Sequence, residues 1–160
     1  ITSNKPFYFS VAIPEGNYDI QLNLGDTKGT SETTVRVENR RMMLNKVKTK
    51  KGEIFEKQIT VHQKDSIIRN QEGIQIGIVK LKPRERKYLH WDNLLTIEFN
   101  GKAPKVCSVI IQPNKKAKTI YITGDSTVVD AQYEPWASWG QMLPYFIVPN
   151  EVVIANYAES

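Results

Sequence analysis

A stretch of strict alternation decides the fold: Asn17-Tyr18-Asp19-Ile20-Gln21-Leu22-Asn23-Leu24. Its large apolar side chains recur at every second position, and polar side chains stand between them. A two-residue period puts the apolar set on one face of a β-strand, whereas a helix would spread the same residues around its axis. The turn signal Pro14-Glu15-Gly16 comes directly before it. The stretch therefore predicts a half-buried strand that begins near Asn17.

Similar apolar or alternating runs lie on both sides of this strand. They cover residues 7–13, 33–37, 55–61, 74–78, 95–99 and 106–111. Turn signals separate several of them, for example Asn100-Gly101, and no window before residue 114 has the period of an amphipathic helix. Several short strands without helices predict an antiparallel β-sandwich over residues 1–114.

The pattern changes at the polar segment 113–118, and we interpret residues 115–118 as a linker. The run 119–123 ends at a glycine, as buried parallel strands often do. Residues 138–147 predict a helix with Ser138 as N-cap, although Pro144 lies past its first turn. Residues 152–156 are a further β-branched run. Strand, helix and strand in this order predict one βαβ unit in residues 119–160. One such unit leaves sheet faces uncovered, so we expect an incomplete domain.

Gly124-Asp125-Ser126-Thr127 follows the first of these two strands. Reactive groups of open α/β sheets lie at the carboxyl ends of the strands. A serine there can point into the crevice, and its own backbone N–H can join an oxyanion hole. The triplet Gly-Asp-Ser alone is also what an ordinary turn or helix N-cap contains, so the motif by itself leaves both interpretations open.

The surroundings favour the catalytic interpretation. The stretch 120–128, Ile-Tyr-Ile-Thr-Gly-Asp-Ser-Thr-Val, resembles the first conserved block of the SGNH (GDSL) hydrolases. Trp139-Gly140-Gln141-Met142-Leu143 resembles the helix start that follows in the rhamnogalacturonan acetylesterase branch, and residues 153–160 resemble the lead-in to the second block. The resemblance covers residues 119–160. It implies a flavodoxin-like α/β hydrolase domain of which this chain holds the first part.

The resemblance also implies a mechanism without cofactor or metal. Ser126 is the expected nucleophile and an oxyanion donor, supported by Gly124, Asp125 and Thr127 of its motif. Asp125 is expected to be structural. The family places its catalytic Asp-x-x-His after the region covered here, and the only histidines, His62 and His90, precede Ser126. We expect both to be surface or partly packed residues of the sandwich.

Two further residues are candidates for contact with a substrate. Trp136 lies in a loop beside the expected crevice, where packing and sugar binding are equally open interpretations. Asn156 ends the second parallel strand. For Trp139 we favour packing at the helix edge.

The strands 16–25 and 95–101 resemble those of galactose-binding-like β-sandwiches, which precede esterase domains in bacterial polysaccharide-degrading enzymes. The expected function is therefore a secreted or periplasmic carbohydrate esterase that removes acetyl groups from a pectin-type polysaccharide. The alternative is a non-catalytic carbohydrate-binding sandwich with a hydrolase remnant, because a sandwich fold does not itself fix a function.

Composition limits the partners. The net charge of +5 comes largely from two basic runs, 46–51 and 115–118, and neither is interleaved with aromatic residues as in a single-strand nucleic-acid groove. We interpret them as solvated turns and a linker and expect no nucleic-acid partner. The single cysteine, Cys107, excludes an internal disulfide and is expected to be an ordinary strand side chain. No apolar run has the length of a membrane span.

Overall fold

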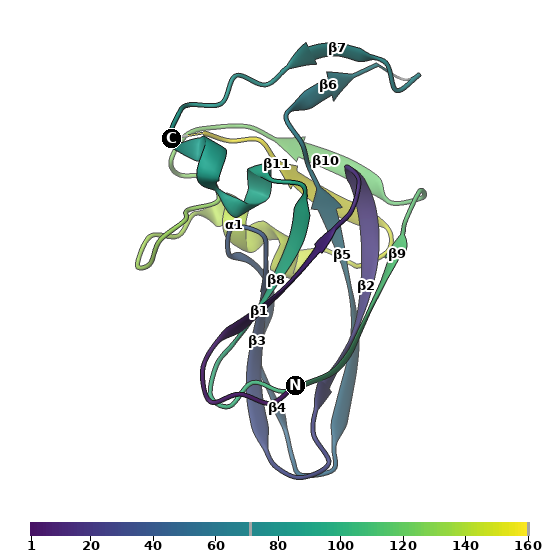
Figure 1. Cartoon of the computed structure of the whole chain (residues 1–160), viewed down its shortest axis with the longest axis vertical. Helices are drawn as coiled ribbons and strands as arrows, with labels where there is room; N and C mark the ends of the chain where they lie inside the picture. The colour runs from purple at the N-terminus through teal and green to yellow at the C-terminus, as the bar shows by residue number, and fades with distance from the viewer. Residues whose placement is uncertain (71, 160) are drawn as a thin grey trace.

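The structure is a computed structural model, and it describes residues 1–70 and 72–159. Two antiparallel sheets form most of it (Figure 1). One has the strand order β1-β8-β3-β4, with β1 (Phe7–Ala12), β8 (Leu94–Asn100), β3 (Ser31–Val37) and β4 (Arg41–Thr49). The other has the order β5-β2-β9, with β5 (Ile54–Gln63), β2 (Gly16–Gly25) and β9 (Val106–Pro113). The predicted antiparallel β-sandwich is thereby confirmed for this part of the chain.

The core lies between the two sheets. The alternating stretch that begins near Asn17 forms β2, and its apolar face is buried while the residues between are half-buried or exposed. The side chains that meet it come from both sheets: Val35, Val37, Ile59, Val61, Leu95, Ile97 and Phe99. Burying this much aliphatic and aromatic surface is the main stabilising contribution to a fold of this kind.

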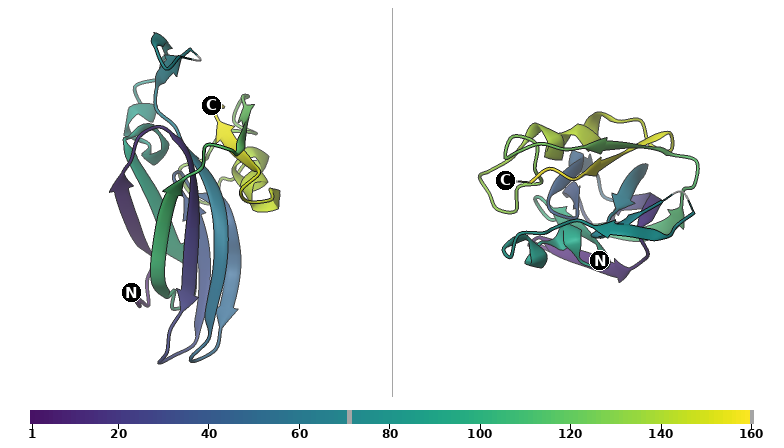
Figure 2. Two further views of the ribbon diagram at one scale, coloured as in Figure 1. Left: turned by 90° about the vertical axis from the view of Figure 1, so that its right-hand side faces the viewer. Right: turned by 90° about the horizontal axis from the view of Figure 1, so that it is seen from above.

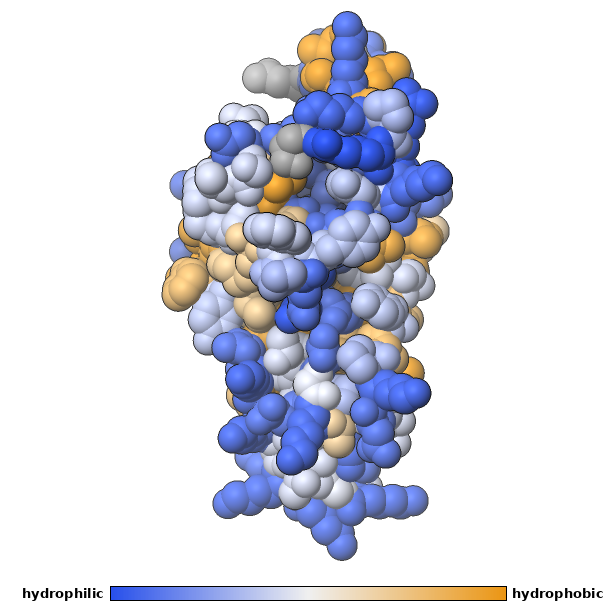
Figure 3. Space-filling view, turned by 90° about the vertical axis from the view of Figure 1, so that its left-hand side faces the viewer, coloured by the Kyte–Doolittle hydropathy of each residue, from blue (hydrophilic) through white to orange (hydrophobic). Residues whose placement is uncertain are grey.

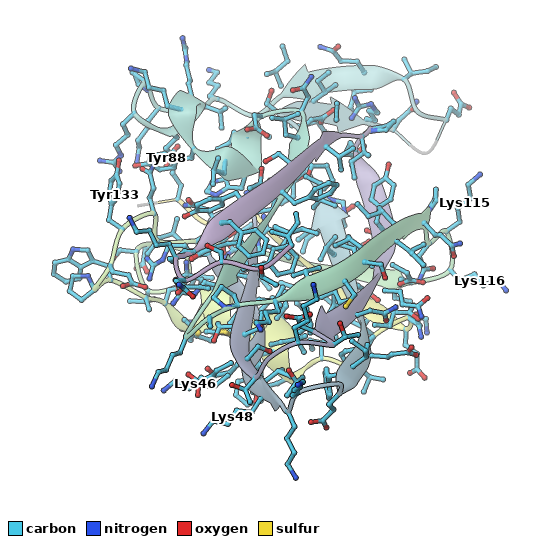
Figure 4. All side chains as sticks on the ribbon, turned by 60° about the horizontal axis from the view of Figure 1, so that its bottom comes forward. Lys46, Lys48, Tyr88, Lys115, Lys116 and Tyr133 are labelled. Atoms are coloured by element: carbon cyan, nitrogen blue, oxygen red, sulfur yellow. The ribbon has the colours of Figure 1, made fainter. Side chains whose placement is uncertain are left out.

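Strand β4 was not predicted, and the interpretation of residues 46–51 as solvated turn was partly wrong. Lys46 and Lys48 lie within β4, and the turn begins only after Thr49. The pairing of β3 with β4 shifts register on either side of Val35, and Lys46 has a positive φ of 49°. These irregularities remove the even alternation by which a strand is recognised in a sequence. Figure 4 shows Lys46 and Lys48 projecting at a different place from Lys115 and Lys116.

A small hairpin extends beyond the sandwich. It consists of β6 (Ile67–Arg69) and β7 (Gln75–Ile78), which pair with each other and with neither large sheet. The predicted strand near residues 74–78 does form, but its isoleucines are exposed instead of facing the core: Ile74, Ile76 and Ile78. Figure 3 shows hydrophobic atoms gathered at this end, while the opposite end is hydrophilic. Two short 3-10 helices, η1 (Glu85–Lys87) and η2 (Leu89–Trp91), lead back into β8.

The carboxy-terminal segment adds a two-stranded parallel sheet. β10 (Lys118–Ile122) and β11 (Val152–Asn156) pair in parallel register, with Ile120 opposite Ile154. Between them lie the short helix α1 (Trp139–Met142) and the 3-10 helix η3 (Leu143–Phe146). Ser138 caps α1 as predicted, accepting a hydrogen bond from the backbone N–H of Gln141. Pro144 sits in the first turn of η3, where the N–H it lacks is not needed.

This segment lies against one side of the sandwich near the hairpin end (Figure 2). Hydrogen bonds also hold the chain between β9 and β10 to the sandwich. The Asn17 side-chain amide donates to the carbonyl of Ala117 and to the hydroxyl of Thr119, at 3.2 and 2.9 Å. Among the described residues, no helix has the length and hydropathy needed to cross a membrane.

Candidate functional site

The turn that follows β10 is held by Asp125. Its carboxylate Oδ1 accepts hydrogen bonds from the backbone N–H and the hydroxyl of Thr127, at 2.9 and 2.8 Å. Its carbonyl accepts from the N–H groups of Val128 and Val129, both at 3.0 Å. The hydrogen bond from the Thr127 N–H is the main reason why the pKa of the Asp125 carboxyl is lowered. The Oδ1 atom and the carbonyl of Asp125 therefore stabilise the turn itself.

Ser126 is exposed on the outside of this turn. The turn lies at the carboxyl end of β10, and the parallel pairing continues past it through a hydrogen bond from the N–H of Glu159 to the carbonyl of Gly124, at 3.0 Å. Within residues 1–70 and 72–159, the Ser126 hydroxyl and N–H make no hydrogen bond. The residue is thus exposed at the place where open α/β sheets hold their reactive residues.

The turn rests on the start of α1. The N–H of Trp139 donates to the carbonyl of Thr127 at 3.2 Å. A Cβ atom on Gly140 would lie 2.2 Å from the carbonyl oxygen of Val128, so only glycine allows this approach. Close packing beneath the turn therefore requires Gly140, whereas the Trp139 side chain is largely exposed.

Asn156 lies beneath the same turn and is buried. Its amide donates to the carbonyl of Val128 and to the Asp130 carboxylate, at 2.7 and 2.8 Å. Its oxygen accepts from the N–H of Ala158 at 3.0 Å. The buried Asn156 side chain thus hydrogen-bonds other groups of the protein and stabilises the turn, and it does not face solvent.

Trp136 is the most exposed of the three tryptophans in the chain, at 73%. Its loop is tied to the sandwich, because the Arg40 guanidinium donates to the carbonyls of Ala131 and Trp136 at 3.1 and 3.0 Å. Glu134 in the same loop forms an ion pair with Arg36 at 2.9 Å. The ring is thus held out in solvent on an anchored loop, which suits contact with a ligand.

Both histidines are buried, so the prediction of surface or partly packed residues was wrong for both. His62 is 3% exposed, and its Nδ1 shares a 2.7 Å hydrogen bond with the Asn17 side chain. Burial, together with the charges of Arg41 and Lys64, lowers the pKa of His62 to about 4. His90 is 2% exposed and packs against the rings of Tyr88 and Trp91. Neither ring makes a contact with Ser126 in the part of the chain that the structure describes.

A cluster that the sequence did not predict joins the sandwich to the carboxy-terminal segment. We call it the charged seam: Glu38, Arg41, Lys64 and Asp130, all nearly inaccessible to water. The Arg41 guanidinium donates to the Asp130 carboxylate at 2.6 Å and to the carbonyl of His62 at 3.2 Å. Burial raises the pKa of Glu38 to about 8, against the opposing charge of Arg41.

Lys64 links the seam to the strand ends. Its ammonium donates to the carbonyl of Asn156 and lies 4.0 Å from the ring centroid of Trp91 and 5.1 Å from that of Tyr157. Burial, and then the charge of Arg41, lowers the pKa of Lys64 to about 7. Lys64 thereby fixes the backbone that leaves β11, one strand away from Ser126. In the sequence it stands in Gln63-Lys64-Asp65, which resembles an ordinary polar turn, so no local signal marks it.

Within the described residues no group of three or more His, Cys, Asp or Glu side chains is placed to hold a metal ion. Cys107 lies in β9 and is exposed, with its Sγ 3.3 Å from the carbonyl of Gly25.

Comparisons with known proteins give little beyond this geometry. No protein-family model and no curated protein sequence matches the chain. Among solved structures, the crystal structure of protein YXIM from Bacillus subtilis matches 96% of this chain at 22% sequence identity, with a TM-score of 0.32. The chain spans 37% of the length of that protein. A likeness at this level carries no argument about the site.

Proposed function

We propose that the protein is a serine esterase of the SGNH type, in which Ser126 attacks acetyl esters on a pectin-type polysaccharide. The observation that carries the proposal is the exposed Ser126 at the carboxyl end of a parallel strand, on a turn held by Asp125. The resemblance of residues 119–160 to the family supplies the reaction class. The galactose-binding-like relationship of the sandwich and a secreted or periplasmic location belong to the same proposal.

In this reaction the Ser126 Oγ attacks the carbonyl carbon of the ester while a general base takes its proton. The sugar alkoxide then leaves with a proton, and an acetyl group stays on the serine. Water releases it as acetate and restores the hydroxyl. In this proposal the backbone N–H of Ser126 would donate to the oxyanion, as the resemblance to the family implies.

In this proposal the base lies outside the described residues, as the resemblance to the family implies. His62 and His90 are buried in the sandwich, and Asp125 is committed to its turn. A serine hydroxyl without a base is a poor nucleophile near neutral pH. The proposed activity is therefore that of the protein at its natural length, with an Asp-x-x-His segment that lies beyond these 160 residues.

The test uses the natural-length protein and p-nitrophenyl acetate. Ser126→Ala is expected to lower kcat/KM by several orders of magnitude, as loss of a nucleophile does. Ser10→Ala is the control, because Ser10 is an exposed serine on β1, outside the turn, whose hydroxyl shares a 2.8 Å hydrogen bond with Thr96, and it should leave turnover unchanged. A fluorophosphonate should also modify Ser126, forming an Oγ–P bond and releasing fluoride. A Ser126→Ala protein with most of the parent turnover would overturn Ser126 as the nucleophile. A natural-length protein without turnover would instead favour the non-catalytic carbohydrate-binding alternative.

A further inference from the structure

A cleft opens where the hairpin β6–β7 stands over the ends of β10 and β11. It encloses about 730 Å³. One side consists of hairpin residues, including Ile67 and Arg69, and the other consists of Tyr121, Thr123 and Tyr157. In Figure 1 the hairpin lies at the top of the view, beyond the sandwich and above β10 and β11. Thr123, on this second side, stands directly after the end of β10, three positions before Ser126 in the chain.

The floor of the cleft is an aromatic pair of which one ring is fixed and one is exposed. Tyr121 is 63% exposed and lies 5.9 Å from Tyr157, centroid to centroid. Tyr157 is held from the protein side by the ammonium of Lys64 and by the edge of Trp91, the latter at 5.8 Å. A ring that is already ordered loses little entropy when a ligand binds to it. Aromatic faces of this kind suit the C–H face of a sugar ring.

The polar groups of the cleft are paired with one another. The Arg69 guanidinium donates to Asp65 at 2.6 and 3.0 Å and to Glu15 at 3.1 Å. One cation thus serves two carboxylates, and the described residues that line the cleft include no further cation for a ligand carboxylate. The outer edges of the Glu15 carboxylate and the Arg69 guanidinium can still hydrogen-bond the hydroxyl groups of a ligand. Such bonds are strong because one partner is ionised.

We propose that this cleft binds one neutral pyranose unit of a glycan, with Tyr121 and Tyr157 as its stacking floor. A uronic acid is disfavoured, since its carboxylate would meet Glu15, while Arg69, the cation among the described lining residues, is already paired with Glu15 and Asp65. The proposal deepens the esterase function, on which its role as a substrate subsite rests: the sandwich, through its hairpin, holds a neutral sugar next to the acetylated one. The binding itself does not depend on hydrolysis.

The test titrates the 160-residue chain with methyl α-rhamnopyranoside, methyl β-galactopyranoside and galacturonic acid, followed by saturation-transfer and chemical-shift NMR. Saturable binding of at least one neutral glycoside, tighter than that of galacturonic acid, is expected. Tyr121→Ala should weaken it about tenfold, whereas Tyr121→Phe, which keeps the ring, should retain it. Tyr8→Ala is the matched control, because Tyr8 is an equally exposed tyrosine, at 60%, on β1 of the sandwich.

Three results would overturn the proposal: no saturable binding of any neutral glycoside, tighter binding of galacturonic acid, or the same loss in Tyr121→Ala and Tyr8→Ala. These results are distinct from failure of the esterase proposal, which is read from turnover by the natural-length protein. A chain that binds a neutral glycoside through Tyr121 in a protein without Ser126-dependent turnover would keep the cleft and discard the esterase.

Discussion

The molecule has two buried regions, the core of the sandwich and the charged seam, and their side chains differ in polarity. Between the sheets of the sandwich the buried side chains are almost all aliphatic or aromatic, for example Leu22, Ile97 and Phe99. Between the sandwich and the carboxy-terminal segment, the charged seam and its amide neighbours are just as inaccessible to water. Apolar burial has no preferred direction, whereas buried hydrogen bonds and ion pairs fix one geometry. We infer that the core supplies most of the stability, and that the seam sets how the segment that carries Ser126 docks.

The seam is polar because loop ends meet there. Side chains of the seam and of its amide neighbours, Asn39 and Gln141, donate to backbone carbonyls that strands and helices leave unpaired. Asn39 donates to the carbonyl of Asp130 at 2.5 Å, and the Gln141 amide donates to the carbonyls of Asn39 and Ala131 at 2.8 and 2.9 Å. Lys64 does the same for Asn156. Removing one member of such a set leaves its partner buried without a hydrogen bond, which costs more than the bond contributes.

The largest effect is expected at the buried ion pair. Asp130→Ala leaves the Arg41 guanidinium buried without its carboxylate and should lower the free energy of unfolding by about 3–5 kcal/mol. The double variant Arg41→Met with Asp130→Leu removes both charges and should recover most of that loss. Urea unfolding of the two variants checks this. If the double variant is no more stable than Asp130→Ala, the seam is not governed by charge pairing and the contrast with the core fails.

In the core, Leu22→Ala should cost about 2–5 kcal/mol, because it removes a fully buried side chain from tight packing. The informative version repeats the substitution in a chain of residues 1–114. We expect this shorter chain to unfold cooperatively with a β-type circular dichroism spectrum and to show the same loss on Leu22→Ala. The expected basis is that the core cluster contains only residues up to Val106 and a few partly buried neighbours up to Ile111. A structureless spectrum would mean that the sandwich depends on the seam.

Acid should affect the seam before the core. The pKa of His62 is about 4 in the folded protein, below its ordinary value of 6.5. Between these values the unfolded chain binds a proton that the folded chain does not, so stability is lost as pH falls from 6.5 to 4, by up to about 3 kcal/mol. His62→Gln should flatten this part of the stability curve.

The comparison of the two proteins isolates His62 because the other groups titrate in both. The lowered pKa of His90 also reduces the stability of the protein as pH falls. The pKa of Glu38 is raised to about 8, so its contribution to stability is lost as pH rises from 4.5 to 8. Urea unfolding at several pH values gives the difference curve. Parallel curves of stability against pH for the wild type and His62→Gln would show that folding does not lower the pKa of His62.

The sequence predicted the core better than the seam, for a physical reason. The two-residue period of β2 is a property of neighbouring residues, and so are the turn before it and the Ser138 N-cap. Strand β4 was missed because bulges in its pairing with β3 break that period. The Gly-Asp-Ser turn was recognisable from its motif. The contacts beneath and beside it were not, because Arg41, Lys64 and Asp130 come from distant segments and no local pattern marks them. Their pairing exists only after both layers have folded.

The smallest effect is expected at the N-cap that supports both the turn and the seam. Ser138 accepts a hydrogen bond from the N–H of Gln141 at 3.0 Å, and the Gln141 side chain crosses the seam to Asn39. Ser138→Ala should cost about 1 kcal/mol, the usual effect of losing a cap, whereas Ser138→Thr, which keeps a hydroxyl, should cost less. The two variants are compared by urea unfolding and by amide hydrogen exchange at Gln141. If the segment docks as one unit, the loss appears in the global unfolding midpoint. If Gln141 exchanges faster while the midpoint stays constant, the segment opens separately from the sandwich, and the seam is then a weaker interior than its burial indicates.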